Sequence, residues 1–303
     1  MTDTTYITGV RRWLCNKIMK TFSWLILSVM GIHVNKKVLS QADVDYSFYL
    51  GQGYKAPSLS QGRTSKIIAP HVSCFDIQAL NFAFHGDVCF LAGAFVKSIP
   101  GLGRLAQLLG TVFVPRSGSK SELSDTLNSL LQRTEQVETK GEFPPLVIFP
   151  EGTCSNNVCL TKFRRGAFFD LRRVTPVTLK YKYGMVHPAI EAIDEPLVVF
   201  LMCCAVQVIE LDLKQLPDFV PNEYLYATHA DKGAEKWEIF AWACRDVMAK
   251  VGGFGKHDIP FKDKNKVYEY YMGRIDSLTF ENGVTVEYRP DGVYDENRSK
   301  KEQ

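Results

Sequence analysis

The 303-residue sequence has no strong net charge and no apolar run long enough for a clean membrane span. A formal net charge of +3 and a pI near 8.3 are too mild to indicate a nucleic-acid-binding protein, and no RNA- or DNA-binding motif accompanies them. A cleavable secretory signal with a small-residue cleavage site is also missing. These absences favour an intracellular protein with, at most, a weak attraction to anionic lipid.

Complete metal-binding patterns are missing too. The chain has eight cysteines, several inside apolar runs, which is typical of reduced thiols packed as small hydrophobic side chains. Four residues separate Cys154 from Cys159, but no second pair of Cys or His at ligand spacing completes a zinc site, so we expect no metal. The lack of a Gly-x-Ser-x-Gly elbow argues against a serine hydrolase of the α/β class.

Short apolar runs alternate with amphipathic segments along most of the chain. At 46% hydrophobic and 23% charged, the sequence can bury one full core. The alternation predicts an α/β fold with a mostly parallel central sheet flanked by helices. The expected strands are 66–69, 88–92, 111–114, 146–149 and 176–181, and the expected helices are 75–84, 102–109 and 121–139. We divide the chain into an N-terminal membrane-associated helical segment (1–37), a main domain (38–255) and a C-terminal extension with a β-hairpin (256–303).

The segment from Trp13 to Ile32 is the candidate for membrane contact. Its first half has a polar and an apolar face, its second half is almost wholly apolar, and basic residues stand before and after it. The pattern is closer to an interfacial or re-entrant helix than to a span, which needs about 20 apolar residues. The alternatives are a helix packed on the domain and a basic targeting leader.

A second apolar run, 197–206, is too short for a span. Gln207 and Glu210 follow it at once. We therefore expect a core helix that runs into a strand.

His71 and Asp76 stand between the first expected strand and the helix that follows it. If the histidine folds back over the helix start, the carboxylate holds one imidazole nitrogen protonated and leaves the other free to accept a proton from an alcohol. This alcohol would belong to a substrate. Ser73 and Asp76 also fit a capping box, so an ordinary helix start is the alternative.

Two further candidate residues follow other expected strands. Arg116 lies on a strand-end turn beside small residues, where a guanidinium can bind a phosphate; a plain surface arginine is the alternative. Glu151 precedes Gly152, which permits a backbone geometry that a side chain would obstruct, and it either fixes a substrate or binds a neighbouring arginine and holds the turn. Ligands collect at the carboxyl ends of parallel strands, so we expect His71, Arg116 and Glu151 to converge.

Four blocks of the sequence carry a resemblance. They are His71 with Asp76, Val112–Arg116 (Val-Phe-Val-Pro-Arg), Phe149–Thr153 (Phe-Pro-Glu-Gly-Thr) and Thr175–Val177 (Thr-Pro-Val). In this order they resemble the glycerolipid acyltransferase family, and the stretches 151–156 and 162–168 resemble its lysophosphatidylcholine acyltransferase branch in particular. Four ordered motifs are far more specific than one. The resemblance covers about residues 38–252 and implies a glycerol-3-phosphate acyltransferase-like fold.

The resemblance implies an O-acyltransferase of phospholipid biosynthesis. Such an enzyme moves a fatty acyl group from acyl-coenzyme A (acyl-CoA) to the hydroxyl of a lysophospholipid or a related glycerol phosphate. It implies His71 as the general base, Asp76 as its orienting carboxylate and Arg116 as the ligand of the acceptor phosphate. The acceptor pocket would be shaped by Glu151, Gly152 and Thr153. Neither a metal nor a cofactor is implied, because acyl-CoA is a substrate.

Three features depart from the family pattern. The second block has Val-Pro-Arg where the phosphatidate-making branch prefers Ile-Asp-Arg, which weakens lysophosphatidate as the acceptor. No Asp-x-Asp-x-Asp-Gly loop follows the domain, so we expect no calcium control. Residues 277–288 instead predict a hairpin turned at Asn282 and Gly283, for which docking is favoured over a lid.

The competing hypothesis comes from a different class. An acyltransferase fold can serve as a structural or lipid-holding subunit of a large membrane complex, for instance a mitochondrial one, with protein partners bound through the N-terminal helix and the C-terminal extension. Intact His71, Asp76, Arg116 and Glu151 argue against lost catalysis. We therefore expect membrane lipid and acyl-CoA as partners, no nucleic acid, and a location on the endoplasmic reticulum or a mitochondrial membrane.

Overall fold

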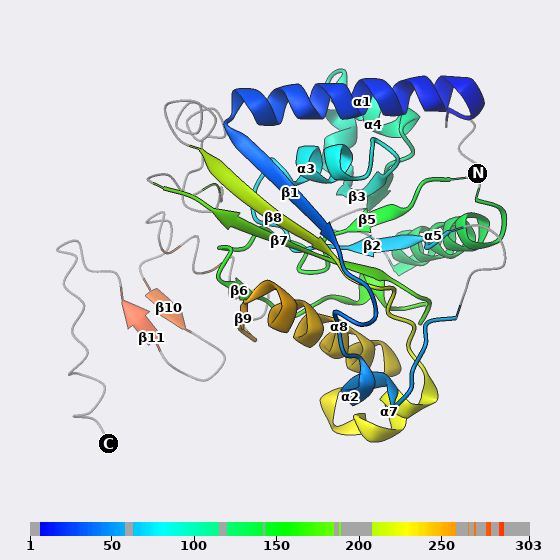
Figure 1. Ribbon diagram of the computed structural model, residues 1–303, viewed down its shortest axis with the longest axis vertical. Coiled ribbons are helices and arrows are strands. Elements are labelled where there is room, and N and C mark those ends of the chain that lie inside the picture. Colours follow the sequence, from blue (N-terminus) through cyan, green and yellow to red (C-terminus); the bar gives the residue numbers. More distant parts are fainter. Residues whose placement is uncertain are drawn as a thin grey trace. The chain divides into compact units, whose positions relative to one another are not determined.

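The computed structural model describes residues 7–57, 63–114, 120–141, 143–184, 188 and 208–258, together with 266, 270, 277–279 and 285–287. The chain divides into two compact units, Met1–His257 and Asp258–Gln303. In the first unit, seven strands form a sheet in the order β1-β8-β7-β2-β5-β3-β4 (Figure 1).

The sheet is parallel except at one pair. Its strands are β1 (Ile32–Val38), β2 (Lys66–Ile68), β3 (Cys89–Gly93), β4 (Val112–Val114), β5 (Leu146–Ile148), β7 (Thr175–Lys182) and β8 (Ile209–Gln215). β7 and β8 are antiparallel, and every other neighbouring pair is parallel. The predicted α/β fold with a mostly parallel sheet is therefore confirmed.

Helices cover both faces of this sheet (Figure 1). α1 (Gly9–Val29) and α3 (Asp76–Ala83) lie on one face, and α8 (Lys236–Gly252) lies on the other. In β2, Ile67 packs in the cluster that includes α1 and α3, whereas Ile68 packs in the cluster that includes α8 and Leu130 of α5 (Lys120–Lys140). Because both faces are buried, the central strand β5 (Leu-Val-Ile) is a continuous apolar run rather than an alternating one.

The helix ends follow local sequence rules. α8 begins with a capping box formed by Glu235 and Glu238 and ends at Gly253, whose φ of +64° suits glycine. The remaining short elements are α2 (Ser47–Leu50), η1 (Ala94–Ser98), α4 (Leu102–Leu108), β6 (Cys159–Leu160), η2 (Arg165–Ala167), α7 (Glu223–Thr228), η3 (Ala230–Lys232) and β9 (Gly255–Lys256).

The second unit contains the predicted hairpin. β10 (Ser277–Thr279) pairs antiparallel with β11 (Thr285–Glu287). Its expected turn at Asn282 and Gly283 lies outside the described residues.

The N-terminal region differs in one respect from the expectation. Residues 32–37, which we grouped with the helical segment, form most of β1, because they pair in parallel with β8 and give that strand a second neighbour. Among the described residues, none of the helices combines the length and the apolar character needed to cross a bilayer. The run 197–206 lies outside the described residues, so its expected core helix stays a prediction.

Candidate active site

β2 delivers the histidine to the carboxyl edge of the sheet. The strand ends at Ile68, and α3 begins at Asp76 after a short connecting segment. Nδ1 of His71 lies 2.8 Å from Oδ2 of Asp76. The histidine thus folds back over the start of the helix, as the spacing of the two residues requires for them to meet.

Asp76 is fully buried and accepts several hydrogen bonds. Its Oδ2 atom also accepts from the backbone N–H groups of Val72 (2.6 Å) and Ser73 (2.8 Å). Its Oδ1 atom accepts from the hydroxyl of Tyr181 at 2.5 Å. The bonds from Val72 and Ser73 tie the turn before α3 to the carboxylate, so one side chain both fixes that turn and holds the histidine. Together with His71, these donors occupy both carboxylate oxygens and fix the orientation of the Asp76 side chain.

The imidazole of His71 is held on its faces as well as at Nδ1. Its ring stacks on Phe149, with centroids 4.2 Å apart and planes inclined by 14°. The side chain keeps 22% of its surface exposed, so a substrate can reach it. Burial lowers the pKa of His71, but hydrogen bonds with Asp76 and Cys154 outweigh it and raise this pKa to about 10. His71 is therefore mostly protonated at neutral pH, and its free-base fraction grows as the pH rises toward 10.

Phe149 of the third sequence block and the residues just after that block lie against the histidine. The N–H of Ser155 donates to the backbone carbonyl oxygen of His71 at 2.5 Å, and the thiol of Cys154 hydrogen-bonds with its ring. β5 ends next to β2 and runs parallel to it, which brings the residues after both strands to the same edge. The structure thus brings together His71, Asp76 and the Glu151 turn.

Glu151 is buried and engaged within its own loop. Its Oε2 atom accepts from both the N–H and the hydroxyl of Thr161, each at 2.9 Å. Gly152 has a φ of +72°, and a Cβ there would lie 2.8 Å from the side chain of Arg164. The contacts that the structure shows for Glu151 are those of the turn-holding alternative. Half-buried Thr153 lies in the same turn.

Arg116 lies outside the described residues, so phosphate binding by this side chain stays a prediction. The strand before it, β4, ends at Val114 and runs parallel to β3. No three His, Cys, Asp or Glu side chains gather as a metal site within the part of the chain that the structure describes.

Tyr181 is a site residue that the sequence analysis did not single out. It lies near the end of β7, and its side chain is on the same face as Val177 and Leu179. Side chains alternate between the two faces of a strand, so the sequence already places Tyr181 on the apolar face of β7. A hydroxyl on such a face needs a polar partner, and this need is the signal that could have identified the residue. Cys154 was considered only as a metal ligand.

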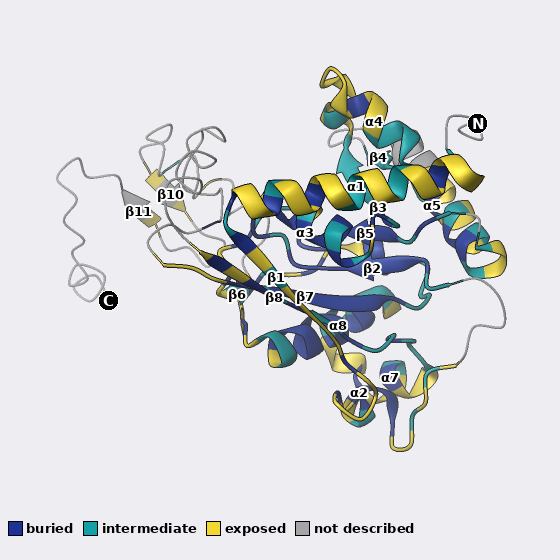
Figure 2. Ribbon diagram, turned by 45° about the horizontal axis from the view of Figure 1, so that its top comes forward, coloured by how far each residue is buried: buried dark blue, intermediate teal, exposed yellow. Residues whose placement is uncertain are grey.

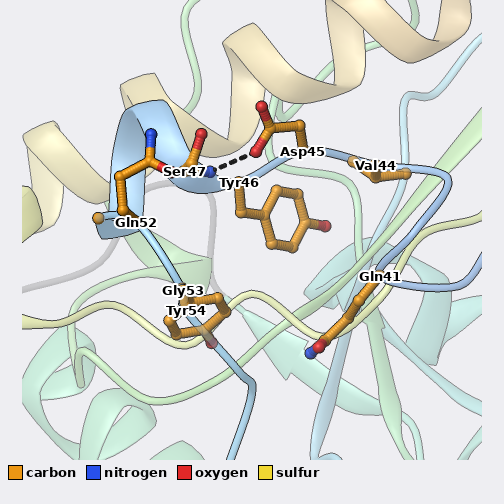
Figure 3. Close-up of a pocket in the computed structure, with 9 residues that line it drawn as sticks. Gln41, Val44, Asp45, Tyr46, Ser47, Gln52, Gly53 and Tyr54 are labelled. Atoms are coloured by element: carbon orange, nitrogen blue, oxygen red, sulfur yellow. Dashed lines mark hydrogen bonds between the residues drawn. The ribbon is translucent and has the colours of Figure 1, made fainter.

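A cavity of about 260 Å³ lies away from this site, lined by residues between Gln41 and Tyr54 (Figure 3). It follows β1, which runs opposite to β7, so it opens at the other edge of the sheet from His71. Oδ1 of Asp45 accepts from the N–H of Ser47 at 2.8 Å, and the hydroxyl of Tyr46 donates to the Pro217 carbonyl at 2.8 Å. The cavity is not part of the histidine site.

Comparison with known proteins gives the family. A family model described as Acyltransferase matches residues 58–198. Lysophosphatidylcholine acyltransferase 1 of Danio rerio is 33% identical over 209 residues, which are 68% of this chain and 37% of that protein. The chain belongs to the acyltransferase family. The resemblance carried by the four sequence blocks is thereby confirmed.

Other members of the acyltransferase family match over different lengths. Lysophospholipid acyltransferase LPEAT1 of Arabidopsis thaliana is 25% identical over 281 residues, 90% of this chain and 68% of the relative. The human lysophosphatidylcholine acyltransferase 1 is 30% identical over 65% of this chain and 34% of its own length. The chain thus spans only about a third of the lysophosphatidylcholine acyltransferases. Among solved structures, the 1-acyl-sn-glycerophosphate (LPA) acyltransferase PlsC from Thermotoga maritima aligns with a TM-score of 0.48 at 16% identity, over 82% of this chain and 84% of that one.

Proposed function

We propose that this chain is an acyl-CoA-dependent O-acyltransferase whose acceptor is a lysophospholipid, similar to lysophosphatidylcholine, or a related glycerol phosphate. The observation that carries the proposal is the hydrogen bond from Nδ1 of His71 to a buried, fully engaged Asp76. When the ring loses its proton, the nitrogen that does not face Asp76 becomes the base, at a partly exposed position beside the Cys154 thiol. The printed names of the relatives support a lysophospholipid as the acceptor class.

The geometry supports a direct transfer. His71 takes the proton of the acceptor hydroxyl as this oxygen attacks the thioester carbonyl, and Asp76 stabilises the imidazolium that forms. The new C–O bond replaces the C–S bond, and His71 returns the proton to the departing coenzyme A sulfur. Backbone N–H groups near Gly152 are proposed to stabilise the oxyanion, a contribution of about 3 kcal/mol per donor. Arg116 is proposed to bind the acceptor phosphate.

We also propose that α1 docks the protein on an intracellular membrane, that of the endoplasmic reticulum or a mitochondrion. α1 turns polar side chains toward the protein: Arg12 donates to the carbonyl of Leu109 (3.0 Å), and Asn16 donates to Asp87 (3.1 Å). Its outward side is exposed (Figure 2) and largely apolar, with more than half of the residue surface exposed at Val10, Trp13, Leu14, Ile18, Phe22, Trp24, Leu25 and Val29. A helix on a surface that faces water turns its apolar side chains toward the protein and its polar side chains outward, which is the opposite of α1.

The apolar surface continues beyond α1. Phe95 in η1, Ile99 just after it, and Leu102 and Leu105 in α4 are also exposed. The bond from Arg12 to Leu109 joins the start of α1 to the end of α4. η1 begins where β3 ends, at the same edge of the sheet as the histidine site. This surface therefore offers lipid substrates a route from a bilayer to His71, and Arg11 and Lys17 suit anionic head groups.

The proposed activity is tested by thiol release from long-chain acyl-CoA. Purified protein in lipid is offered lysophosphatidylcholine, lysophosphatidylethanolamine, lysophosphatidate and glycerol-3-phosphate in turn, beside His71→Ala. Turnover with a lysophospholipid that the variant lacks would support the proposal. Folded protein that turns over none of the acceptors would overturn it and favour a structural or lipid-holding subunit.

Membrane docking is tested by flotation with vesicles of phosphatidylcholine and a minor fraction of phosphatidylserine. Trp13→Glu with Phe22→Glu should lose most of the binding, because both changes place charge on the outward side of α1. Tyr224→Glu is the matched control, since Tyr224 is exposed on α7. Equal flotation of both variants would refute docking through α1.

A further inference from the structure

We propose that Tyr181 is a positioning residue of the histidine site, whose hydroxyl fixes the orientation of Asp76 and, through Asp76, the position of His71 as a base. The inference rests on the proposed function of His71. It concerns a contact between β7 and the start of α3 that none of the four sequence blocks contains.

The two oxygens of Asp76 have different partners. Oδ2 faces the histidine turn and accepts from its backbone as well as from His71. Oδ1 accepts from Tyr181 at 2.5 Å, and the two side chains are almost wholly buried, so water does not readily replace the hydroxyl. A carboxylate fixed at both oxygens cannot rotate about its terminal torsion, which is otherwise broad.

Tyr181 is itself held by the loop that follows the Glu151 turn. The side chain of Asn157 donates to the carbonyl oxygen of Tyr181 at 2.7 Å and accepts from its N–H at 3.1 Å. Asn157 has a φ of +62°, a left-handed conformation that asparagine tolerates better than most residues. The fourth sequence block begins β7, so this strand and the loop that contains Asn157 together place the hydroxyl at Asp76.

The hydroxyl also affects the proton on His71. A donor at Oδ1 withdraws negative charge from the carboxylate, and so weakens its attraction for the imidazolium. Within the described part of the chain, the titratable groups that act on the ring are Asp76 from α3 and Cys154 from the loop after β5. Loss of the hydroxyl should strengthen the hold of Asp76 on the proton and move the acidic limb of the activity profile to higher pH.

The test compares Tyr181→Phe with Tyr49→Phe. Tyr49 is the matched control because its hydroxyl donates to Asp246, a second buried carboxylate, in the core cluster on the other face of the sheet. We expect Tyr181→Phe to lower kcat about 10- to 100-fold, as loss of a supporting partner commonly does, with KM for both substrates little changed. The acidic limb of kcat/KM against pH should move upward in Tyr181→Phe and stay in place in Tyr49→Phe.

A second replacement keeps the shape of the side chain. With 3-fluorotyrosine at position 181, the phenol is a stronger donor, so the acidic limb should move to lower pH. The same two shifts should appear in the NMR titration of His71, which does not require turnover. If both replacements titrate like the wild type, the inference is wrong. If the titrations shift but no variant turns over, the positioning role stands and the proposed reaction fails.

Discussion

The backbone N–H of Ser155 donates to the backbone carbonyl oxygen of His71, and this bond joins the loop just after the third sequence block to the first block. Because the contact is between main-chain atoms, it does not depend on the Ser155 side chain. The Ser155 hydroxyl is buried without a hydrogen-bond partner among the described residues. The backbone and the side chain of this residue therefore have separable effects.

Ser155→Pro should abolish the proposed activity, whereas Ser155→Ala should retain it. Proline removes the N–H that holds the histidine segment, while alanine removes only an unsatisfied hydroxyl, which is neutral or mildly stabilising. Thiol release and thermal unfolding of both variants check this. Equal activity in the two variants would contradict the proposed importance of the backbone bond.

Asp76→Asn should remove a pH-dependent part of the stability. The pKa of His71 is raised from 6.5 to about 10 in the folded protein. Stabilisation by the charged pair is therefore fully present below about pH 6.5 and is lost as the pH rises toward 10. We expect the wild type to lose about 2 kcal/mol more than the variant between these limits. Urea unfolding across this range measures the difference, and parallel curves would count against a charged His71.

Cys154→Ala should move the acidic limb of the activity profile to lower pH. The thiol contributes to the raised pKa of His71, so its removal lets the ring lose its proton more easily. Cys159→Ala is a suitable control because Cys159 is also half-buried but is not among the groups that shift this pKa. An unchanged profile for Cys154→Ala would show that the thiol does not influence the base.

Local patterns predicted the histidine motif well. The apolar run at β2, the helical periodicity of α3 and the spacing from His71 to Asp76 are all contained within twenty residues. In a parallel sheet the residues after neighbouring strands lie at the same edge, so the sequence also predicted that the Glu151 turn lies near His71. The contact of Tyr181 with Asp76 was out of reach, because it joins residues 105 positions apart and depends on which strand pairs with β2.

The orientation of α1 was equally beyond local patterns. The sequence shows a polar and an apolar face in the first half of this helix, but periodicity does not say which face meets the protein. The structure places Arg12 and Ser23 inward, where Ser23 donates to Gln78 at 3.1 Å. The inward direction of the polar face follows from its hydrogen-bond partners on α3 and after α4. These partners satisfy the polar groups that α1 buries against the protein.

Lys66→Met should destabilise the protein by about 3–5 kcal/mol. Lys66, on the strand that leads to His71, pairs with Asp170, and both side chains are at most 2% exposed. Its ammonium also donates to the carbonyl of Ala167 at 3.0 Å. Removing the cation leaves a buried carboxylate without its counter-charge, which costs far more than the intact pair contributes.

The matched control for Lys66→Met is Lys236→Met, which breaks an exposed pair with Glu223. This change should cost less than about 1 kcal/mol, because water and salt screen both charges. The double variant Lys66→Met with Asp170→Leu should recover much of the loss, since it removes the isolated charge together with its partner. Urea unfolding at neutral pH measures all three variants. If Lys66→Met costs no more than Lys236→Met, the buried pair does not stabilise the strand that carries the histidine.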